Sequence, residues 1–165
     1  MLKSSGPLEP YGMYVFADCE FTDFLTCELV SVGLVAADGR EFYAERNDYD
    51  EAACNAFVRA AVLPQLGHCP DRMFTREGLR AALLEWLAGF DGGFVCVDHA
   101  TDWDLLLDVL YTTPNGWKGL HVGQLVNNAE RERYFSVHGG RHHALHDARA
   151  LRASMPADLS AVDGH

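Results

Sequence analysis

Apolar and polar positions in the first third of the chain follow a pattern typical of β-strands. Residues 13–20 (MYVFADCE) are rich in aromatic and β-branched side chains and end in two carboxylates. Two further apolar runs, 28–37 and 40–45, flank the dipeptide Asp38-Gly39. Asp-Gly between such runs predicts a tight type I′ hairpin, because glycine tolerates the positive φ that this turn requires. We therefore expect three antiparallel strands at the start of the fold.

The middle of the chain carries helical patterns. One helix is predicted over about 50–62 and should be halted by Pro64, and a second is predicted over 75–90 with Thr75 as its N-cap. The second helix has an apolar stripe that should face the core, formed by Leu79, Leu83, Trp86, Leu87 and Phe90.

Another strand and two more helices are predicted in the C-terminal half. Residues 94–98 (FVCVD) form a short apolar run suited to a buried strand, and a helix over about 102–111 should be ended by Pro114. The segment 114–141 shows no assignable period. The last helix is expected over 142–154, with one apolar face made of Ala144, Leu145, Ala148 and Leu151. This order of elements predicts an α/β fold in which helices cover a mixed β-sheet.

Length and composition predict one domain. At 165 residues and 48% hydrophobic, the chain can bury a core that is stable without disulfides or cofactors. We expect an N-terminal extension over 1–12, the folded domain over 13–153 and a flexible tail over 154–165. The sequence has no apolar run of about eighteen residues to span a bilayer, and its first ten residues lack the apolar stretch of a signal peptide. The expected location is the cytoplasm, with no membrane partner.

Cysteine usage and charge narrow the chemistry further. The five cysteines are odd in number and lack CxxC spacing, which disfavours a disulfide framework and a zinc ribbon and favours free or buried thiols. With 24 acidic against 13 basic residues and a net charge of −11, the surface as a whole should repel a polyanion. Any nucleic acid must therefore be held locally.

Two acidic elements have the composition of a divalent-metal site. Asp18 and Glu20 are one residue apart on a predicted strand, so both side chains project from the same face. Asp98 ends the buried strand and Asp102 starts the next helix. Carboxylates of this kind suit Mg²⁺ or Mn²⁺. Each element also has an ordinary interpretation, as exposed strand-end acids and as a helix N-terminal acid favoured by the helix dipole.

A third element lies at the last helix, where His142 is followed five positions later by Asp147. A histidine with a reference pKa near 6.5 is suited to proton transfer at neutral pH. The alternative is a zinc site, because His142 and His146 are four positions apart as in an HxxxH pair. Against zinc, the residue after His142 is His143 and not the glutamate of a metalloprotease.

In this order, the three elements resemble the motifs of the DEDDh superfamily of 3′-to-5′ exonucleases, which have an RNase H-like fold. The DxE motif is matched by Asp18 and Glu20, the second aspartate motif by Asp102, and the Hx4D motif by His142 and Asp147. The chain is especially similar to a small bacterial branch of RNase T-like exoribonucleases, over about 13 to 153, in the segments FADCEFTD, ELVSVGLVAADGREFYAE, TDWDLL and HHALHDAR. It departs from the superfamily at Asp98, where asparagine is frequent.

The resemblance implies a 3′-to-5′ exoribonuclease that hydrolyses single-stranded RNA or short oligonucleotides to nucleoside 5′-monophosphates, and a homodimer. It assigns the four carboxylates to two Mg²⁺ or Mn²⁺ ions and His142 to proton acceptance. It also places Phe21 and Thr22 against the terminal nucleotide, where an aromatic ring can stack on a base. Core packing is the alternative role for Phe21.

A basic cluster precedes the third motif, formed by Arg131, Arg133, His138 and Arg141. We predict that this cluster, and Arg133 and Arg141 in particular, meets the phosphates upstream of the 3′ end. A solvated helix face is the alternative. Two other functions stay open on the sequence, a DNA-directed 3′-to-5′ exonuclease and a non-catalytic nucleic-acid- or metal-binding module.

Overall fold

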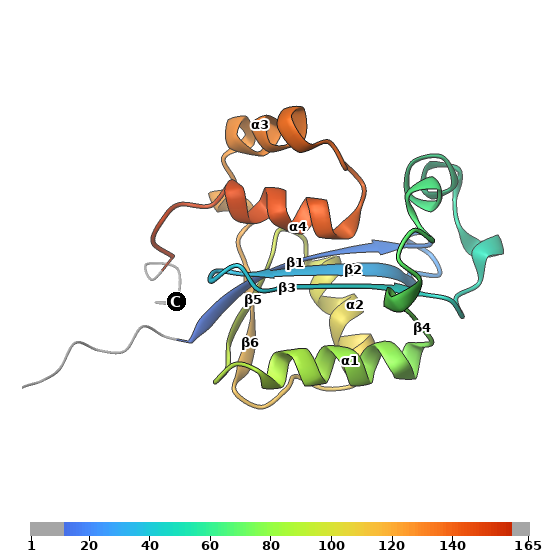
Figure 1. The fold of residues 1–165 in the computed structure, drawn as a ribbon, viewed down its shortest axis with the longest axis horizontal. Coiled ribbons are helices and arrows are strands. Elements are labelled where there is room, and N and C mark those ends of the chain that lie inside the picture. The colour runs from blue at the N-terminus through green and yellow to red at the C-terminus, as the bar shows by residue number, and fades with distance from the viewer. Residues whose placement is uncertain (1–11, 160–165) are drawn as a thin grey trace, which may run out of the picture.

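The computed structural model describes residues 12–159, and its centre is a six-stranded sheet in the order β4-β3-β2-β1-β5-β6 (Figure 1). The first three strands are antiparallel neighbours, whereas β4 pairs with β3, β5 with β1 and β6 with β5 in parallel. The strands are β1 (Met13–Phe21), β2 (Leu29–Ala36), β3 (Glu41–Arg46), β4 (Met73–Phe74), β5 (Gly93–Val97) and β6 (Trp117–His121).

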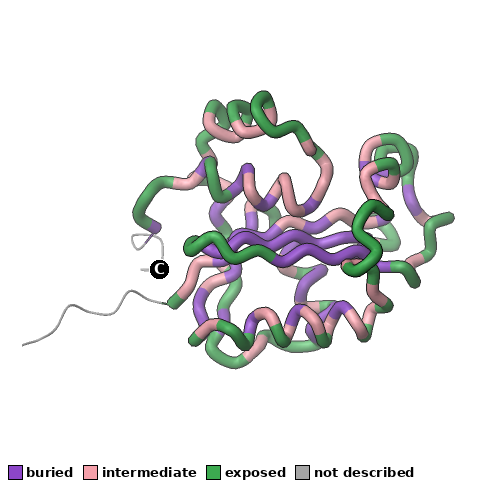
Figure 2. Tube along the Cα trace, viewed as in Figure 1, coloured by how far each residue is buried: buried purple, intermediate pink, exposed green. Residues whose placement is uncertain are grey.

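Helices cover both faces of this sheet (Figure 1). One face packs against α1 (Arg76–Ala88) and α2 (Ala100–Leu110), and the other against α4 (Ala144–Ala153), with α3 (Asn128–His138) lying on α4. Strand β2 lies between β1 and β3 and is buried along its whole length (Figure 2), which explains its continuous apolar sequence. The predicted α/β fold, an RNase H-like mixed sheet flanked by helices, is confirmed.

The predicted hairpin between β2 and β3 is confirmed, but its turn type is wrong. A type I′ turn needs positive φ at both central residues. Gly39 has a φ of 97°, whereas Asp38 is not among the residues with positive φ. The N–H of Gly39 donates to the carbonyl of Ala36, and the N–H of Ala36 donates to that of Arg40. These bonds define a three-residue loop, in which an ordinary turn is followed by a left-handed glycine.

The single helix predicted over 50–62 is wrong. The chain instead forms a 3₁₀ turn η1 (Glu51–Ala53), a π-helical turn η2 (Val58–Val62) and a second 3₁₀ turn η3 (Leu63–Gln65). The break follows from Cys54, whose backbone is extended, and from Asn55, whose side chain accepts the N–H of Val58 and starts a new turn. Pro64 lies within η3 and does not halt the helix.

The other helices differ from prediction mainly at their ends. The side chain of Thr75 caps α1 as predicted, by accepting the N–H of Gly78. Helix α2 ends at Leu110, where Tyr111 turns left-handed with a φ of 69°, so Pro114 is not the residue that ends it. The unassigned segment 114–141 contains β6, a 3₁₀ turn η5 (Gly123–Leu125) and α3. A further 3₁₀ turn, η4 (Pro70–Arg72), precedes β4.

The described residues include only part of the predicted N-terminal extension and of the predicted tail. Residues 1–11 and 160–165, which hold nearly all of the predicted extension and half of the predicted tail, lie outside the described residues. Leu159 is buried and packs with Phe16, Cys96, Val122 and Leu151. The packed core therefore continues past residue 153. Within the described chain, no helix is both long and apolar enough to cross a membrane.

Candidate active site

Asp18 and Glu20 lie near the C-terminal end of β1 and share the face of the sheet that α4 covers. Their neighbours Val15, Ala17 and Cys19 point to the opposite face, where they join the core beneath α1 and α2. In the register of the sheet, Asp18 lies opposite Gly33 of β2 and Glu20 lies opposite Ser31. The alternation predicted from sequence thus puts the two carboxylates side by side.

Gly33 allows the last helix to approach these acids closely. A Cβ atom at Gly33 would lie 2.5 Å from backbone atoms of Ala144 and Leu145. Only a residue without a side chain permits this distance, so α4 begins directly over β2, beside the strand position of Asp18. Asp147, in the first turns of α4, is carried to the acids of β1 by this contact.

Asp102 reaches the same place from the first turn of α2. Its side chain is buried, and its Oδ1 accepts the backbone N–H of Cys19 at 3.0 Å. This bond joins the start of α2 to β1 between the two carboxylates of that strand. Asp102 is therefore fixed in the site by β1 itself and is not a solvated helix-end acid.

His142 stands just before α4 in an unusual backbone conformation. The sequence predicted a helix from residue 142, but α4 begins at Ala144 and His142 has a φ of 66°. A left-handed conformation costs a residue with a side chain roughly 1 kcal/mol or more. The N–H of His142 donates to both carboxylate oxygens of Asp147, at 3.1 and 3.3 Å. His142 therefore lies in a loop, which lets it share a site with Asp147.

The five predicted residues meet in one place and, together with Asp98, form two groups. Within each group, one ligand atom per residue lies within 4.8 Å of the others. The first group is Glu20, His142 and Asp147, and the second is Asp18, Asp98 and Asp102. Two adjoining cavities of about 240 and 250 Å³ open onto the site, and Asp18, His99, His142 and Asp147 line both of them. Each group could hold a metal ion.

Burial and mutual repulsion make these acids hard to ionise. Burial, then the charge and hydrogen bond of Asp147, raise the pKa of Glu20 to about 8. Burial raises the pKa of Asp102 to about 7, against the opposing hydrogen bond from Cys19. Burial and the charges of Asp102 and Asp147 raise the pKa of Asp18 well above its usual range. Divalent cations would relieve this repulsion, and the carboxylate oxygens of these acids are donors that fit Mg²⁺ or Mn²⁺.

Asp98, which the sequence placed in the second acidic element without a role, is a sixth member of the site. Its Oδ2 lies 2.9 Å from a guanidinium nitrogen of Arg131 on α3, and both side chains are largely buried. The ion pair offsets the extra negative charge of Asp98 beside Asp18 and Asp102. The sequence showed both residues but no sign that they pair, because 33 positions separate them.

Aromatic side chains surround the mouth of the site. Phe21 and Phe24 line the cavity beside Glu20, with ring centroids 5.1 Å apart in an edge-to-face arrangement. Phe24 is 80% exposed and Phe57 is 54% exposed. The ring of Phe57 contacts that of His142. Phe24 and Phe57 were missed in the sequence, since hydrophobic periodicity predicts burial and does not identify exposed rings.

Thr22 is not brought into the cavity. It is fully buried, its hydroxyl lies 2.7 Å from that of Thr26, and it accepts the N–H of Glu28. Its side chain therefore stabilises the turn between β1 and β2. The predicted contact of Thr22 with a substrate does not fit this position.

The basic cluster is divided between the site and the solvent. Arg141 lines the cavity, donates to Glu132 and lies 4.3 Å above the ring of Phe135. Arg133 is 71% exposed at its side chain, pairs with Glu130 and does not line either cavity. Arg141 and Arg131 therefore face the acids, and Arg133 belongs to the outer face of α3.

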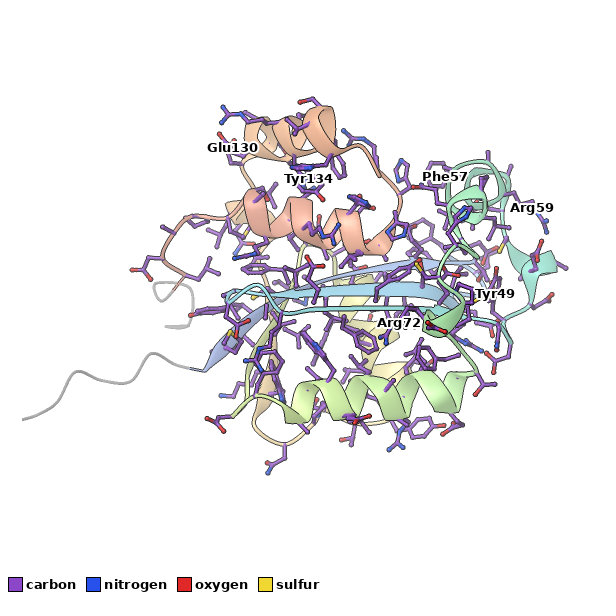
Figure 3. All side chains as sticks on the ribbon, viewed as in Figure 1. Tyr49, Phe57, Arg59, Arg72, Glu130 and Tyr134 are labelled. Atoms are coloured by element: carbon purple, nitrogen blue, oxygen red, sulfur yellow. The ribbon has the colours of Figure 1, made fainter. Side chains whose placement is uncertain are left out.

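The zinc alternative finds no support among the described residues. His146 is absent from both groups of possible ligands, and its Nδ1 lies 2.9 Å from the hydroxyl of Tyr134. Tyr134 points from α3 toward α4 (Figure 3), so His146 belongs to the packing between these helices. Each of the five cysteines is a thiol outside any disulfide, as expected, and none of them belongs to either group.

Comparison with known proteins bears on the same chemistry. No protein-family model matches the chain. Two curated proteins of Mycobacterium tuberculosis, from strains CDC 1551 and H37Rv, are each 40% identical to it over 77 residues. Both are named 3′-5′ exoribonuclease. The match covers 46% of this chain and 46% of each relative, so it spans about half the length of the curated relatives.

Proposed function

We propose that this protein is a divalent-metal-dependent 3′-to-5′ exoribonuclease of the DEDDh type, acting on single-stranded RNA or short oligonucleotides. The observation that carries the proposal is the convergence of four carboxylates and one histidine on one pair of cavities. They come from three separate parts of the chain, residues 18–20, 102 and 142–147. The partial similarity to proteins named 3′-5′ exoribonuclease supports the reaction.

In the proposed site, Asp18, Glu20, Asp102 and Asp147 hold two Mg²⁺ or Mn²⁺ ions. When bound, such ions supply positive charge for a scissile phosphate and make a water easier to deprotonate. The protein contributes a fixed set of oxygen ligands, because β1, α2 and α4 are joined through Cys19, Asp102 and Gly33. The local positive charge also explains how a protein of net charge −11 accepts a polyanion.

His142 is the proposed general base. It lies at the rim of both cavities, with its backbone held by Asp147 and its ring beside Phe57. From there it accepts a proton from the attacking water, and hydrolysis releases a nucleoside 5′-monophosphate. For this role the ring of His142 must keep a fixed position relative to the carboxylates throughout the reaction.

Phe21 and Phe24 are the proposed contacts for the terminal base, because they line the cavity at the carboxylate end. Stacking on such rings tolerates different bases. Arg141, which lines the adjoining cavity, is the proposed contact for the phosphate upstream of the cleaved bond. Arg133 has a weaker claim to this role, since its guanidinium points to solvent.

The proposal is tested with a 5′-labelled single-stranded RNA and its DNA counterpart, in Mg²⁺, Mn²⁺, Zn²⁺ or EDTA. We expect a ladder that shortens from the 3′ end with Mg²⁺ or Mn²⁺, stops with EDTA and is absent for Asp18→Ala. If the protein cuts the DNA strand faster than the RNA strand, the proposed substrate is wrong and the protein is a DNA-directed exonuclease. If neither strand is cut while Mn²⁺ still binds, the chain is a binding module and the proposed reaction is wrong.

We further propose a homodimer in the cytoplasm, with the folded domain beginning near residue 13 and extending past residue 153 to include Leu159. Light scattering should then give twice the subunit mass of 18.3 kDa. A single-subunit mass at working concentration would contradict the dimer without affecting the proposed chemistry.

A further inference from the structure

The loop that carries His142 has a conformation that its own residues do not all favour. Gly139 and Gly140 have φ angles of 64° and 79°, and His142 has one of 66°. The glycines adopt this region freely, but a histidine does so only where neighbouring groups hold it. The position of His142 therefore depends on contacts from outside the loop.

Helix α4 provides the contacts on one side. The N–H of His142 donates to Asp147, and the N–H of His143 donates to the carbonyl of Gly140 at 3.0 Å. The first bond ties the peptide before His142 to α4, and the second closes a turn within the loop itself. They leave two groups to be fixed, the carbonyl of Arg141 and the imidazole ring itself.

A distant segment, residues 55–65, provides the contacts on the other side. The side-chain Nε2 of Gln65 donates to the carbonyl of Arg141 at 2.8 Å, across 76 positions of sequence. The same nitrogen donates to the carbonyl of Ala61 at 2.8 Å, so both amide hydrogens are used. The ring of Phe57 meets that of His142 edge to face, with centroids 4.8 Å apart.

This segment is itself fixed to the core. Val58 and Val62 of the π-helical turn are buried against Val30 of β2. The N–H of Asn55 donates to the carbonyl of Thr22 at the end of β1. In Figure 1 the segment stands beside the loop that leads into α4, and Figure 3 labels Phe57 on it. A π-helical turn is often kept where a function requires it.

We propose that Gln65 is a positioning residue for His142, which it holds through the carbonyl of Arg141, with Phe57 packing against the ring. The catalytic consequence rests on the proposed function. Misplacing a catalytic group by about 1 Å can lower a rate by roughly 10²-fold. Gln65 lies away from both cavities, so its loss acts on the rate through His142 and not through substrate contacts.

The variants Gln65→Glu and Gln65→Leu test this inference. Both remove the amide donor at nearly constant size, and they differ in polarity, so agreement between them assigns the effect to the lost donor. Gln124→Leu is the matched control, because Gln124 is an exposed glutamine in η5 that lines neither cavity. We expect kcat to fall by about 10- to 100-fold, with KM and Mn²⁺ affinity within about twofold of the parent protein.

A double-variant cycle with His142→Ala shows whether Gln65 acts through His142. In the His142→Ala background, Gln65→Leu should lower the residual rate by less than about twofold. An equal loss in both backgrounds, or an unchanged kcat in the single variants, would overturn the proposal. Thermal melting of each variant separates these results from unfolding.

An NMR measurement keeps this inference separate from the proposed function. If the parent protein cleaves no nucleic acid, the proposed function fails, but the ring signals of His142 can still be followed. They are assigned by their loss in His142→Ala. We expect Gln65→Leu to shift or broaden them while the signals of His121, on the edge strand β6, stay in place. Unchanged His142 signals would refute the positioning role.

Discussion

The backbone N–H of Cys19 donates to the carboxylate of Asp102 at 3.0 Å, across 83 positions of sequence. The bond ties the strand that carries two acids to the helix that carries a third. It also uses one oxygen of a buried acid whose pKa is raised to about 7. Asp102 thus has a structural bond and a proposed ligand role at once.

Asp102→Asn separates the two roles of Asp102. The amide oxygen can still accept the N–H of Cys19, but the ligand charge is lost, so activity should fall by at least about 10³-fold. The metal-free variant should melt no lower than the parent at about pH 8, because a buried negative charge has been removed. Nuclease assays and thermal melting check both parts. Full activity would remove Asp102 from the proposed metal set.

The acidic site should make the metal-free protein less stable as the pH rises. The pKa values of Glu20 and Asp102 are raised to about 8 and about 7 in the folded state, from ordinary values of 4.5 and 3.8. Their contribution to stability is therefore complete below about pH 4 and is lost as the pH rises through about 7 to 8. In EDTA, Tm should fall by several degrees between about pH 5.5 and 8.5.

Two additions to that experiment identify the cause. Adding Mn²⁺ at about pH 8.5 should restore Tm, because the cations offset the repulsion and bind only the folded site. Glu20→Gln should flatten the pH dependence in EDTA. A Tm that rises with pH in the metal-free parent would contradict this account.

Removing the imidazole of His142 should affect turnover and spare the fold. We expect His142→Ala to lower kcat by roughly 10²- to 10⁴-fold, the usual size of a general-base effect. Its Tm should stay near that of the parent, because the backbone bond to Asp147 does not need the ring. Unchanged turnover would remove His142 from the mechanism.

The two arginines of the basic cluster should differ in their effects. Arg141→Ala should raise KM severalfold and weaken its dependence on salt, because Arg141 faces the cavity. Arg133→Ala should change both quantities less, because its side chain is 71% exposed outside the cavities. Equal effects of the two substitutions would show that the substrate runs over the outer face of α3.

Gly33→Ala should disrupt the site without touching any of its ligands. The added Cβ would lie 2.5 Å from the backbone of Ala144 and Leu145, so α4 must shift away from β2. We expect a loss of about 2 kcal/mol or more in the free energy of unfolding and a fall in Mn²⁺ affinity. Gly78→Ala in α1 is the control, because its Cβ would meet only side-chain atoms, none nearer than 3.3 Å.

Sequence periodicity predicted those parts of the fold in which local and long-range forces agree. Alternation along β1 placed Asp18 and Glu20 on one face, and the helix periods of α1 and α2 were read nearly to their ends. The prediction of one helix over 50–62 was wrong because the side chain of Asn55 accepts the N–H of Val58 and starts a new helical turn. Such competition between a side chain and the backbone leaves no trace in hydrophobic periodicity.

The candidate site residues could be predicted from the sequence, but the contacts around them could not. Asp18, Glu20, Asp102, His142 and Asp147 could be picked out because their spacings match known motifs. Contacts between distant segments, by contrast, have no local signal. The pairing of Asp98 with Arg131, the bond from Gln65 to Arg141 and the burial of Thr22 all depend on how the helices dock.

The docking of α4 over Gly33 has a consequence for the order in which the protein is made. Asp147 lies late in the chain, and it reaches the acids of β1 through the packing of α4 on the sheet that β1, β2 and β5 form. A nascent chain whose residues 142–147 are still inside the ribosome lacks both His142 and Asp147. Until both residues emerge and α4 docks, the polypeptide carries no assembled site and so, under the proposed function, nothing with which to cut its own messenger.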